Sequence, residues 1–286
     1  MNKVDLHVHT NASDGRFSPA DIILKAHELK LAYIAITDHD TVSGIFPALE
    51  TAKTLSYPKV IPGVELSADI PEGEVHILGY FINCQNKELQ ASLEIFRNSR
   101  LNRALKMTAN LQNLGINIDW KRVAEIAGDS TIGRPHIAQA MLEKGYITTF
   151  KDAFNKYIGR DCPAYVPREK MTPVEAVKLV LQADGLPVMA HPFTVSNPEQ
   201  LIIQLQSSGL VGIEAYYNNY NASDMKRLVR LAEQYNLCVT GGSDYHGIDM
   251  NNETMIGDVD LPFKAVEQLL LLAEQSGLKP ALQEYK

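Results

Sequence analysis

Two histidines near the start of the chain are separated by a single residue, in the segment VDLHVHT at positions 4–10. The apolar run predicts a strand, in which alternate side chains share a face. We therefore expect His7 and His9 to project together, while Leu6 and Val8 face apolar packing. Asp14 ends the polar turn that follows and could return a carboxylate to the same place. Imidazole binds Zn, Mn, Fe and similar ions, so the pair indicates half of a metal site.

More histidines and carboxylates stand in or just after other short apolar runs that are rich in strand formers. They are His39 after 33–37, Glu65 at the end of 60–65, His76 within 75–81, His191 at the end of 187–191, and Asp244 with His246 after 238–242. Singly, each has an ordinary explanation as a buried histidine, a partner of a lysine or a helix cap. Placed together on one face of a sheet, they indicate a shared site.

The spacing of strands and helices supplies such a face. A further strand is predicted at 211–215, and helical patterns occupy 18–29, 47–55, 172–183, 198–207, 222–235 and 262–276. Strands separated by helices predict an α/β protein with a mainly parallel sheet. In a βα barrel the carboxyl ends of the strands gather on one face, where active sites lie.

The strand pattern stops between residues 88 and 160. A long helical period ends at Gly115, and shorter helical patterns follow at 119–127, 135–144 and 149–158. We predict an inserted lid or substrate domain, the alternative being a pair of long connections. The predicted organisation is a first barrel part at 1–95, a helical insertion at 96–160 and a second barrel part at 161–286.

Composition excludes several classes of protein. A chain of 286 residues with 45% hydrophobic and 21% charged residues has the composition of a globular protein. No apolar run reaches the roughly 20 residues that span a bilayer, so we expect no membrane partner and a cytoplasmic location. The net charge of −7 disfavours binding to duplex DNA. Cys84, Cys162 and Cys238 are too far apart for a cysteine-based zinc motif.

The number of candidate ligands predicts more than one ion. Six imidazoles and three carboxylates exceed the three or four protein ligands of a typical site, so we expect two or three divalent ions. Glu65 is the natural bridge, because the two oxygens of a carboxylate can hold two cations roughly 3.5–4 Å apart. Such a pair lowers the pKa of bound water and clamps a phosphoryl group.

An ordered set of motifs gives the chain a family resemblance. The motifs are DLHVHT at 5–10, TDHD at 37–40, GVE at 63–65, His76, AHP at 190–192 and SDYH at 243–246. In these the chain resembles the PHP (polymerase and histidinol phosphatase) phosphoesterases. The resemblance implies a distorted seven-stranded, TIM-like (β/α)7 barrel with a helical insertion and up to three metal ions.

The resemblance also implies which residues share an ion. One ion would take His7, His9, Glu65 and Asp244, a second would take Glu65, His76 and His191, and a third would take Asp14, His39 and His246. The three-metal histidinol phosphatases often have a histidine where this chain has Asp14. A carboxylate there favours a harder ion, so Mn is expected ahead of Fe or Zn, the alternative being partial occupancy of this third site.

A second motif points to a particular branch of the family. The helical insertion with GRPH at 133–136 resembles enzymes that remove the 3′-phosphate of nucleoside 3′,5′-bisphosphates, some of which also trim 5′-mononucleotides from short RNA. Arg134 can grip phosphate through two nitrogens and His136 can donate to it. The alternative is that this motif only starts a helix. Asn102 and Arg103 are further candidate substrate contacts.

The ligand set and the resemblance together predict a metal-dependent phosphoesterase. The resemblance implies that it hydrolyses the 3′-phosphate of nucleoside 3′,5′-bisphosphates, with the trimming of 5′-mononucleotides from short RNA as a second activity. A metal-bound water, held by Glu65, His191 and Asp244, is expected to attack phosphorus. The alternatives are histidinol-phosphate hydrolysis or another small phosphomonoesterase activity, and a polymerase-type proofreading exonuclease. An alternative of another class is a metal-binding regulatory module without catalysis.

Overall fold

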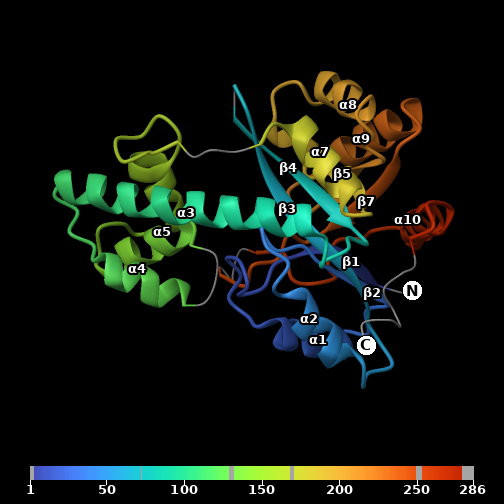
Figure 1. Ribbon diagram of the computed structural model, residues 1–286, viewed down its shortest axis with the longest axis horizontal. Coiled ribbons are helices and arrows are strands. Elements are labelled where there is room, and N and C mark those ends of the chain that lie inside the picture. The colour runs from blue at the N-terminus through green and yellow to red at the C-terminus, as the bar shows by residue number, and fades with distance from the viewer. Residues whose placement is uncertain (1–2, 72, 129–131, 168–170, 249–252, 279–286) are drawn as a thin grey trace. The chain divides into compact units, whose positions relative to one another are not determined.

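Strands and helices alternate along both ends of the chain in the computed structural model (Figure 1). The structure describes residues 3–71, 73–128, 132–167, 171–248 and 253–278. The strands are β1 (Val4–Val8), β2 (Tyr33–Ile36), β3 (Lys59–Ile70), β4 (Gly73–Tyr80), β5 (Leu186–Met189), β6 (Gly212–Tyr217) and β7 (Cys238–Gly242). The helices beside them are α1 (Pro19–Glu28), α2 (Ile45–Ala52), α7 (Pro173–Gln182), α8 (Pro198–Gln206), α9 (Ala222–Gln234) and α10 (Phe263–Gln275), with a 3-10 turn η2 (Pro192–Thr194).

Local sequence signals explain where the helices begin. The Ser18 side chain accepts a hydrogen bond from the Asp21 backbone at the start of α1, and Thr172 does the same with Glu175 at the start of α7. Each cap satisfies a backbone N–H that the first helical turn leaves without a partner. Proline follows each cap, where its missing N–H costs nothing.

The seven strands lie side by side in their order along the chain. Four of the six neighbouring pairs are parallel, as the alternation of strands and helices predicts. β4 is the exception, since it runs antiparallel to both β3 and β5. Only two residues separate Ile70 from Gly73, and a connection that short can join antiparallel strands but not parallel ones.

Contacts between the first and last strands bring the sheet close to a full circle. The backbone of Asp244 donates to the carbonyl of His7 at 2.9 Å, and the backbone of His9 donates to the carbonyl of Tyr245 at 3.0 Å. Val8 and Tyr245 form an isolated parallel bridge beside these bonds. The prediction of a distorted seven-stranded α/β barrel is confirmed.

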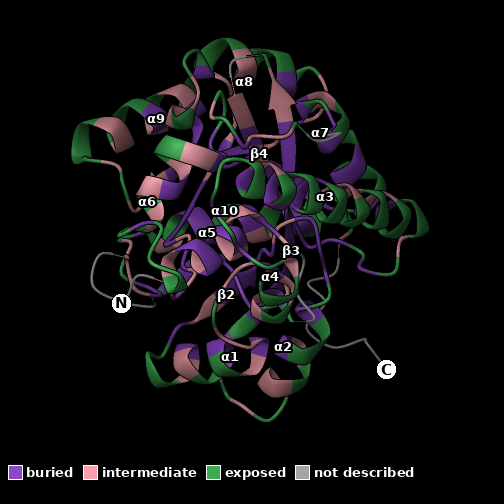
Figure 2. Ribbon diagram, turned by 90° about the vertical axis from the view of Figure 1, so that its left-hand side faces the viewer, coloured by how far each residue is buried: buried purple, intermediate pink, exposed green. Residues whose placement is uncertain are grey.

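The two faces of β1 have different surroundings. Leu6 belongs to the apolar core that includes α10, and Val8 belongs to the core that includes α1. His7 and His9 alternate with them and are also fully buried. Figure 2 shows buried residues on the inner strands and exposed residues on helices such as α1 and α8. The alternation of a strand therefore sends the apolar side chains to the helices and the two imidazoles to the opposite face.

A separate helical unit interrupts the barrel sequence. The chain divides into one compact unit of Met1–Ala91 with Lys170–Lys286, and another of Ser92–Glu169. Its elements are α4 (Trp120–Ala127), α5 (Arg134–Glu143), α6 (Phe150–Ala153), the π-helix η1 (Phe154–Ile158) and all but the first five residues of α3 (Lys87–Asn113). Its own apolar core includes Met107, Leu111, Val123, Ile137 and Met141. The boundaries at 95 and 160, and the role of lid or substrate domain, stay predictions.

One of the predicted helices is divided in the structure, and no described helix is suited to cross a membrane. The single helix expected at 149–158 is divided into α6 and the wider turn of η1, which follows it directly. Among the described residues, none of the helices has the length and apolar character needed to cross a membrane.

Candidate metal centre

The strands deliver the nine predicted ligands to one region of the barrel. His7 lies on β1, Glu65 on β3 and His76 on β4, while His9, His39, His191, Asp244 and His246 closely follow the ends of strands. His39 is held beside Glu65 by backbone bonds on both sides, from Asp40 to Glu65 at 2.9 Å and from Glu65 to Asp38 at 3.2 Å. These bonds extend the pairing of β2 with β3 beyond the end of β2.

Glu65 lies at the centre of the cluster and is fully buried. Its Oε1 is 2.8 Å from Nδ1 of His76 and 3.1 Å from Nε2 of His191. Its Oε2 is 3.0 Å from Nδ1 of His39, 3.2 Å from Nε2 of His9 and 3.3 Å from Nε2 of His7. Five imidazoles therefore lie around this carboxylate. Both oxygens therefore face several ligand-type nitrogens at once.

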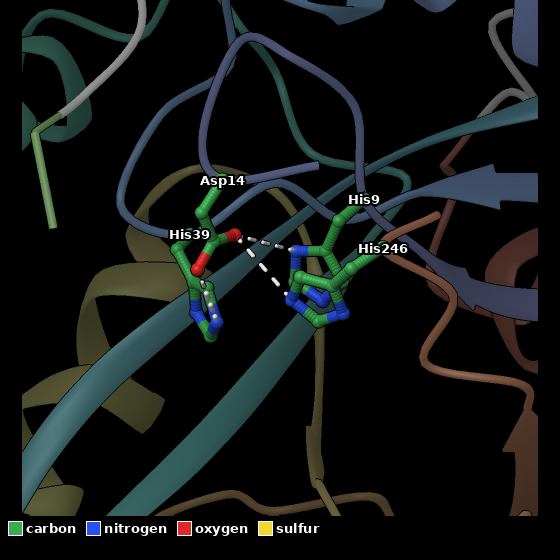
Figure 3. Close-up of side chains that lie close together, drawn as sticks. All are labelled: His9, Asp14, His39 and His246. Carbon is green, nitrogen blue, oxygen red and sulfur yellow. Dashed lines mark ion pairs between the residues drawn. The ribbon is translucent and has the colours of Figure 1, made fainter. Parts of the chain in front are cut away.

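Asp14 returns from the turn after β1, as its place in the sequence predicts. Figure 3 shows its carboxylate between His39 on one side and His9 with His246 on the other. Its oxygens lie 3.4 Å from Nε2 of His246 and 3.9 Å from the nearest nitrogens of His9 and His39. The rings of His9 and His246 stack with centroids 4.1 Å apart.

Asp244 reaches the same cluster from the end of β7. Its Oδ1 lies 3.0 Å from Nε2 of His9 and 3.3 Å from Nε2 of His7. Its Oδ2 accepts a hydrogen bond from the Tyr217 hydroxyl at 2.9 Å. One oxygen is therefore tethered by the protein, and the other faces the imidazoles.

The ligand-type atoms fall into three groups, each small enough to surround an ion. They are His7 with His9, Glu65 and Asp244; His9 with Asp14, His39 and His246; and His39 with Glu65 and His76. The first equals the set that the family resemblance implies, and the second adds His9 to the implied set. The third has His39 where the resemblance implies His191, although His191 also touches Glu65. That these groups bind ions stays a prediction.

Several atoms at the centre of the cluster are poorly satisfied by the protein. Within the described chain, Nε2 of His7, both ring nitrogens of His9, Oδ1 of Asp14 and Oε2 of Glu65 are buried without a hydrogen bond of good geometry. Buried polar atoms normally have partners, because an unsatisfied group costs roughly 1–3 kcal/mol. Nitrogen and carboxylate donors at such spacing fit divalent metal ions.

Burial and charge act in opposite directions on the pKa values of the cluster. Burial lowers the pKa of His39 to about 3, which leaves its ring neutral. Burial also disfavours charge on His76, but the carboxylate of Glu65 outweighs it and raises the pKa of His76 to about 10. The pKa of Glu65 falls well below its usual value because the attraction of the neighbouring imidazoles, the charged ring of His76 among them, overcomes its burial. Glu65 is therefore ionised at neutral pH.

The buried carboxylates that hold the ligand-bearing turns were not predicted from the sequence. Asp38 accepts from the backbone and hydroxyl of Thr10 at 2.7 and 2.8 Å, and from the Ser13 hydroxyl at 2.6 Å. These bonds shape the turn that leads to Asp14. The only signal was its place in the TDHD motif, which does not tell a ligand from a support.

Asp5 is a second support of this kind. It accepts from the backbone and hydroxyl of Ser243 at 3.0 and 2.7 Å, and from the backbone of Gly257 at 2.8 Å. The bonds tie β1 to the segment that carries Asp244. A third carboxylate that was not predicted, Glu214 on β6, contacts His7 and His191.

The four predicted substrate contacts all belong to the helical unit. Arg134 and His136 begin α5, where Nδ1 of His136 accepts from the backbone of Gly133 at 3.0 Å. The motif therefore does start a helix, and a role in substrate binding stays a prediction. Arg103 is buried and donates to the Val166 carbonyl at 2.9 Å, whereas Asn102 is exposed.

A barrel that gathers six histidines and three carboxylates at its strand ends has the architecture of a metal-dependent hydrolase. The chain belongs to the PHP domain family, whose model matches residues 5–157. It is therefore a member of a family of phosphoesterases, and it is a hydrolase that acts on phosphoric ester bonds.

Known proteins resemble the chain over most of its length. A 3′,5′-nucleoside bisphosphate phosphatase of Chromobacterium violaceum is 30% identical over 272 residues, which cover 92% of this chain and 93% of the relative. The 5′-3′ exoribonuclease Rnm of Escherichia coli is 30% identical over 247 residues, covering 85% of this chain and 84% of that enzyme. A solved structure from Bifidobacterium adolescentis, provisionally assigned as a metal-dependent phosphoesterase, superposes with a TM-score of 0.86 at 30% identity, covering 94% of this chain and 96% of that one.

Proposed function

We propose that this chain is a metal-dependent phosphoesterase that removes the 3′-phosphate from nucleoside 3′,5′-bisphosphates. The observation that carries the proposal is the buried carboxylate of Glu65 with imidazoles around both of its oxygens. The similarity to a nucleoside bisphosphate phosphatase over 92% of the chain supports the choice of substrate.

The nine clustered residues are proposed to hold two or three divalent ions. His7, His9, Glu65 and Asp244 would hold one, Glu65 with His39, His76 and His191 would hold another, and Asp14 with His9, His39 and His246 would hold a third. Bound there, the ions would supply Lewis acidity and lower the pKa of a coordinated water. The oxygen ligand from Asp14 favours Mn over Zn or Fe at the third position.

The protein's own groups have distinct tasks in this proposal. Glu65 stays ionised at neutral pH, and its two oxygens would serve two metal positions. Asp244 offers Oδ1 while Tyr217 holds its Oδ2, which fixes the direction of the free oxygen. Arg134 and His136 are proposed to bind the phosphate groups of the nucleotide, with Asn102 and Arg103 as further contacts.

A second activity, the release of 5′-mononucleotides from short RNA, is proposed on the basis of the exoribonuclease relative. Both reactions break the bond between phosphorus and the 3′ oxygen of a nucleotide that carries a 5′-phosphate. Both also release a 5′-mononucleotide. One site that binds the first nucleotide could therefore catalyse the two reactions.

The test is phosphate or nucleotide release by the purified protein with added Mn²⁺. Adenosine 3′,5′-bisphosphate, 5′-AMP, histidinol phosphate and a short 5′-phosphorylated RNA serve as parallel substrates. The proposal expects rapid release from the bisphosphate, release of mononucleotides from the RNA, and little reaction with 5′-AMP. Faster hydrolysis of histidinol phosphate would overturn the choice of substrate, and inactivity on all four with metal bound would also contradict it.

A further inference from the structure

Glu214 is a fully buried carboxylate on β6 that contacts two of the candidate metal ligands. Its Oε1 lies 2.9 Å from Nδ1 of His7, and its Oε2 accepts a hydrogen bond from the backbone N–H of His191 at 2.8 Å. His7 stands on β1 and His191 follows β5, so one side chain joins two distant parts of the barrel. Isolated charges are rarely buried completely, and this one has a partner on each oxygen.

The contact with His7 determines which of its ring nitrogens can bind an ion. A neutral imidazole carries a proton on one nitrogen and a lone pair on the other, and only the lone pair binds metal. When Nδ1 donates to Glu214, the lone pair lies on Nε2. That atom lies 3.3 Å from Oε2 of Glu65 and 3.3 Å from Oδ1 of Asp244, at the centre of the cluster.

The contact with His191 fixes its backbone. His191 has φ 27° and ψ 63°, in the left-handed region that is costly for a residue with a side chain, by roughly 1–2 kcal/mol. Such a conformation persists when surrounding contacts hold it. The bond to Glu214 is one of these contacts, and in this conformation Nε2 of His191 lies 3.1 Å from Oε1 of Glu65.

An irregularity in β6 is consistent with a strand that holds the ligands of other strands in place. The register of β6 with β7 shifts between Glu214 and Tyr216. In a regular strand, residues three apart face opposite sides, but a bulge changes that alternation. Tyr217 consequently also reaches the cluster, where its hydroxyl donates to Oδ2 of Asp244. β6 thus holds ligands supplied by other strands.

We propose that Glu214 is a positioning residue that directs Nε2 of His7 and the ring of His191 toward the metal positions. Through its two oxygens it would connect the metal position that includes His7 with the one that includes His191. The inference rests on the proposed function, since it assumes that the cluster binds metal. A carboxylate is required because both partners are donors, so both of its atoms must accept.

The test is the Glu214→Gln variant, which keeps the shape of the side chain but has a single accepting oxygen. In one orientation the amide N–H faces the backbone N–H of His191, so that two donors oppose each other. In the other orientation it faces Nδ1 of His7, which favours the tautomer with the proton on Nε2. We expect the affinity for Mn²⁺, titrated into metal-stripped protein without substrate, to fall roughly tenfold to a hundredfold. With saturating metal, we expect the KM for the bisphosphate to stay at its wild-type value.

Thr240→Val is the matched control, because Thr240 is fully buried and pairs with Glu214 across the β6–β7 ladder. Among the described residues its hydroxyl has no hydrogen bond to a candidate ligand, so this variant should keep the wild-type Mn²⁺ affinity. Circular dichroism of the metal-stripped proteins checks that each variant is folded. If Glu214→Gln does not fold, Glu214→Asp replaces it, since it keeps both oxygens but draws them back, and it should also bind Mn²⁺ more weakly.

The outcomes separate this inference from the proposed function. A wild-type protein that binds no divalent metal would overturn both. A wild-type protein that binds Mn²⁺, together with a folded Glu214→Gln variant of equal affinity, would overturn only the positioning role. Equal affinity in Glu214→Asp would have the same meaning where that variant is the one tested.

Discussion

At the residue scale, the centre depends on side chains that use their two polar atoms differently. Asp244 gives Oδ2 to the Tyr217 hydroxyl and directs Oδ1 at His9 and His7. The neighbouring imidazoles overcome its burial and lower its pKa, so it is ionised at neutral pH. The protein therefore determines both the negative charge of Asp244 and the direction of its Oδ1 in the absence of an ion.

Asp244→Asn tests this assignment directly. The amide is nearly the same size as the carboxylate but neutral, so we expect the fold to persist. The Mn²⁺ affinity and the phosphoesterase activity should each fall by roughly a hundredfold or more, because losing a residue that only supports a metal ligand already costs roughly tenfold to a hundredfold. Metal content and the rate of phosphate release are the measurements. Glu50→Gln, which changes an exposed carboxylate on α2, should leave both unchanged. Wild-type activity in Asp244→Asn would exclude Asp244 as a ligand.

The raised pKa values of two histidines predict how metal binding depends on pH. Beside Glu65 and Asp14 respectively, His76 and His246 each have a pKa raised to about 10 although burial opposes it. Their charged forms therefore stabilise metal-stripped protein fully below about pH 6.5, and this contribution is lost as the pH rises toward 10.

Because an ion binds only the neutral ring, Mn²⁺ must displace these protons. We expect its affinity to increase from about pH 6.5 toward pH 10, with protons released on binding. Calorimetric titrations in buffers of different ionisation enthalpy measure both quantities. An affinity independent of pH, without proton release, would show that His76 and His246 do not bind as neutral ligands.

At the element scale, the approach of β7 to β1 brings Asp244 and His246 close to His7 on β1 and to His9 just after it. Gly242 ends β7, and a Cβ there would lie 2.4 Å from the backbone nitrogen of His7 and 2.5 Å from its Cβ. Both atoms belong to rigid parts of β1, so they cannot move aside as a flexible side chain would. The close approach of the two strands therefore requires glycine at this position.

Gly242→Ala should push β7 away from β1. We expect the free energy of unfolding to fall by about 1–3 kcal/mol, as for other overpacked interiors, together with a loss of Mn²⁺ affinity. Urea denaturation and metal titration measure the two effects. Gly73→Ala is the control, because a Cβ at Gly73 meets no atom within 4 Å. Equal stability of the two variants would contradict the tight contact between the strands.

At the scale of the whole molecule, the predicted metal ligands and the predicted substrate contacts belong to different units of the chain. The nine ligands lie in the barrel, whereas Arg134 and His136 lie in the helical unit. Each unit has its own apolar core, so a change in one can leave the other folded. The division allows metal binding and substrate binding to be tested separately.

Arg134→Ala should raise the KM for adenosine 3′,5′-bisphosphate roughly tenfold to a hundredfold, the range expected for a lost hydrogen bond to a charged group. The metal content should not change. Arg122→Ala is the matched control, since Arg122 is an arginine of the same unit that pairs with Glu143 and Glu125 at the surface. Steady-state kinetics and metal analysis are the measurements. An unchanged KM would remove Arg134 from substrate binding.

Local patterns in the sequence predicted much of the barrel and its candidate ligands. The alternation of Leu6, His7, Val8 and His9 fixed which side chains share a face, because the period of a strand is a property of its backbone. The cap at Ser18 located the start of α1 in the same way. The antiparallel course of β4 was not predicted, since it depends on pairing with β3 and β5.

The sequence by itself determined the order of the elements, the faces of the strands and the set of residues with ligand chemistry, since each depends on neighbours a few positions away. Only the tertiary structure decided which carboxylates face the cluster and which support it. Glu214 contacts His7 across 207 positions, and Asp38 contacts Ser13 across 25. A carboxylate has the same chemistry in both roles, so its role follows from which groups the fold places beside each oxygen.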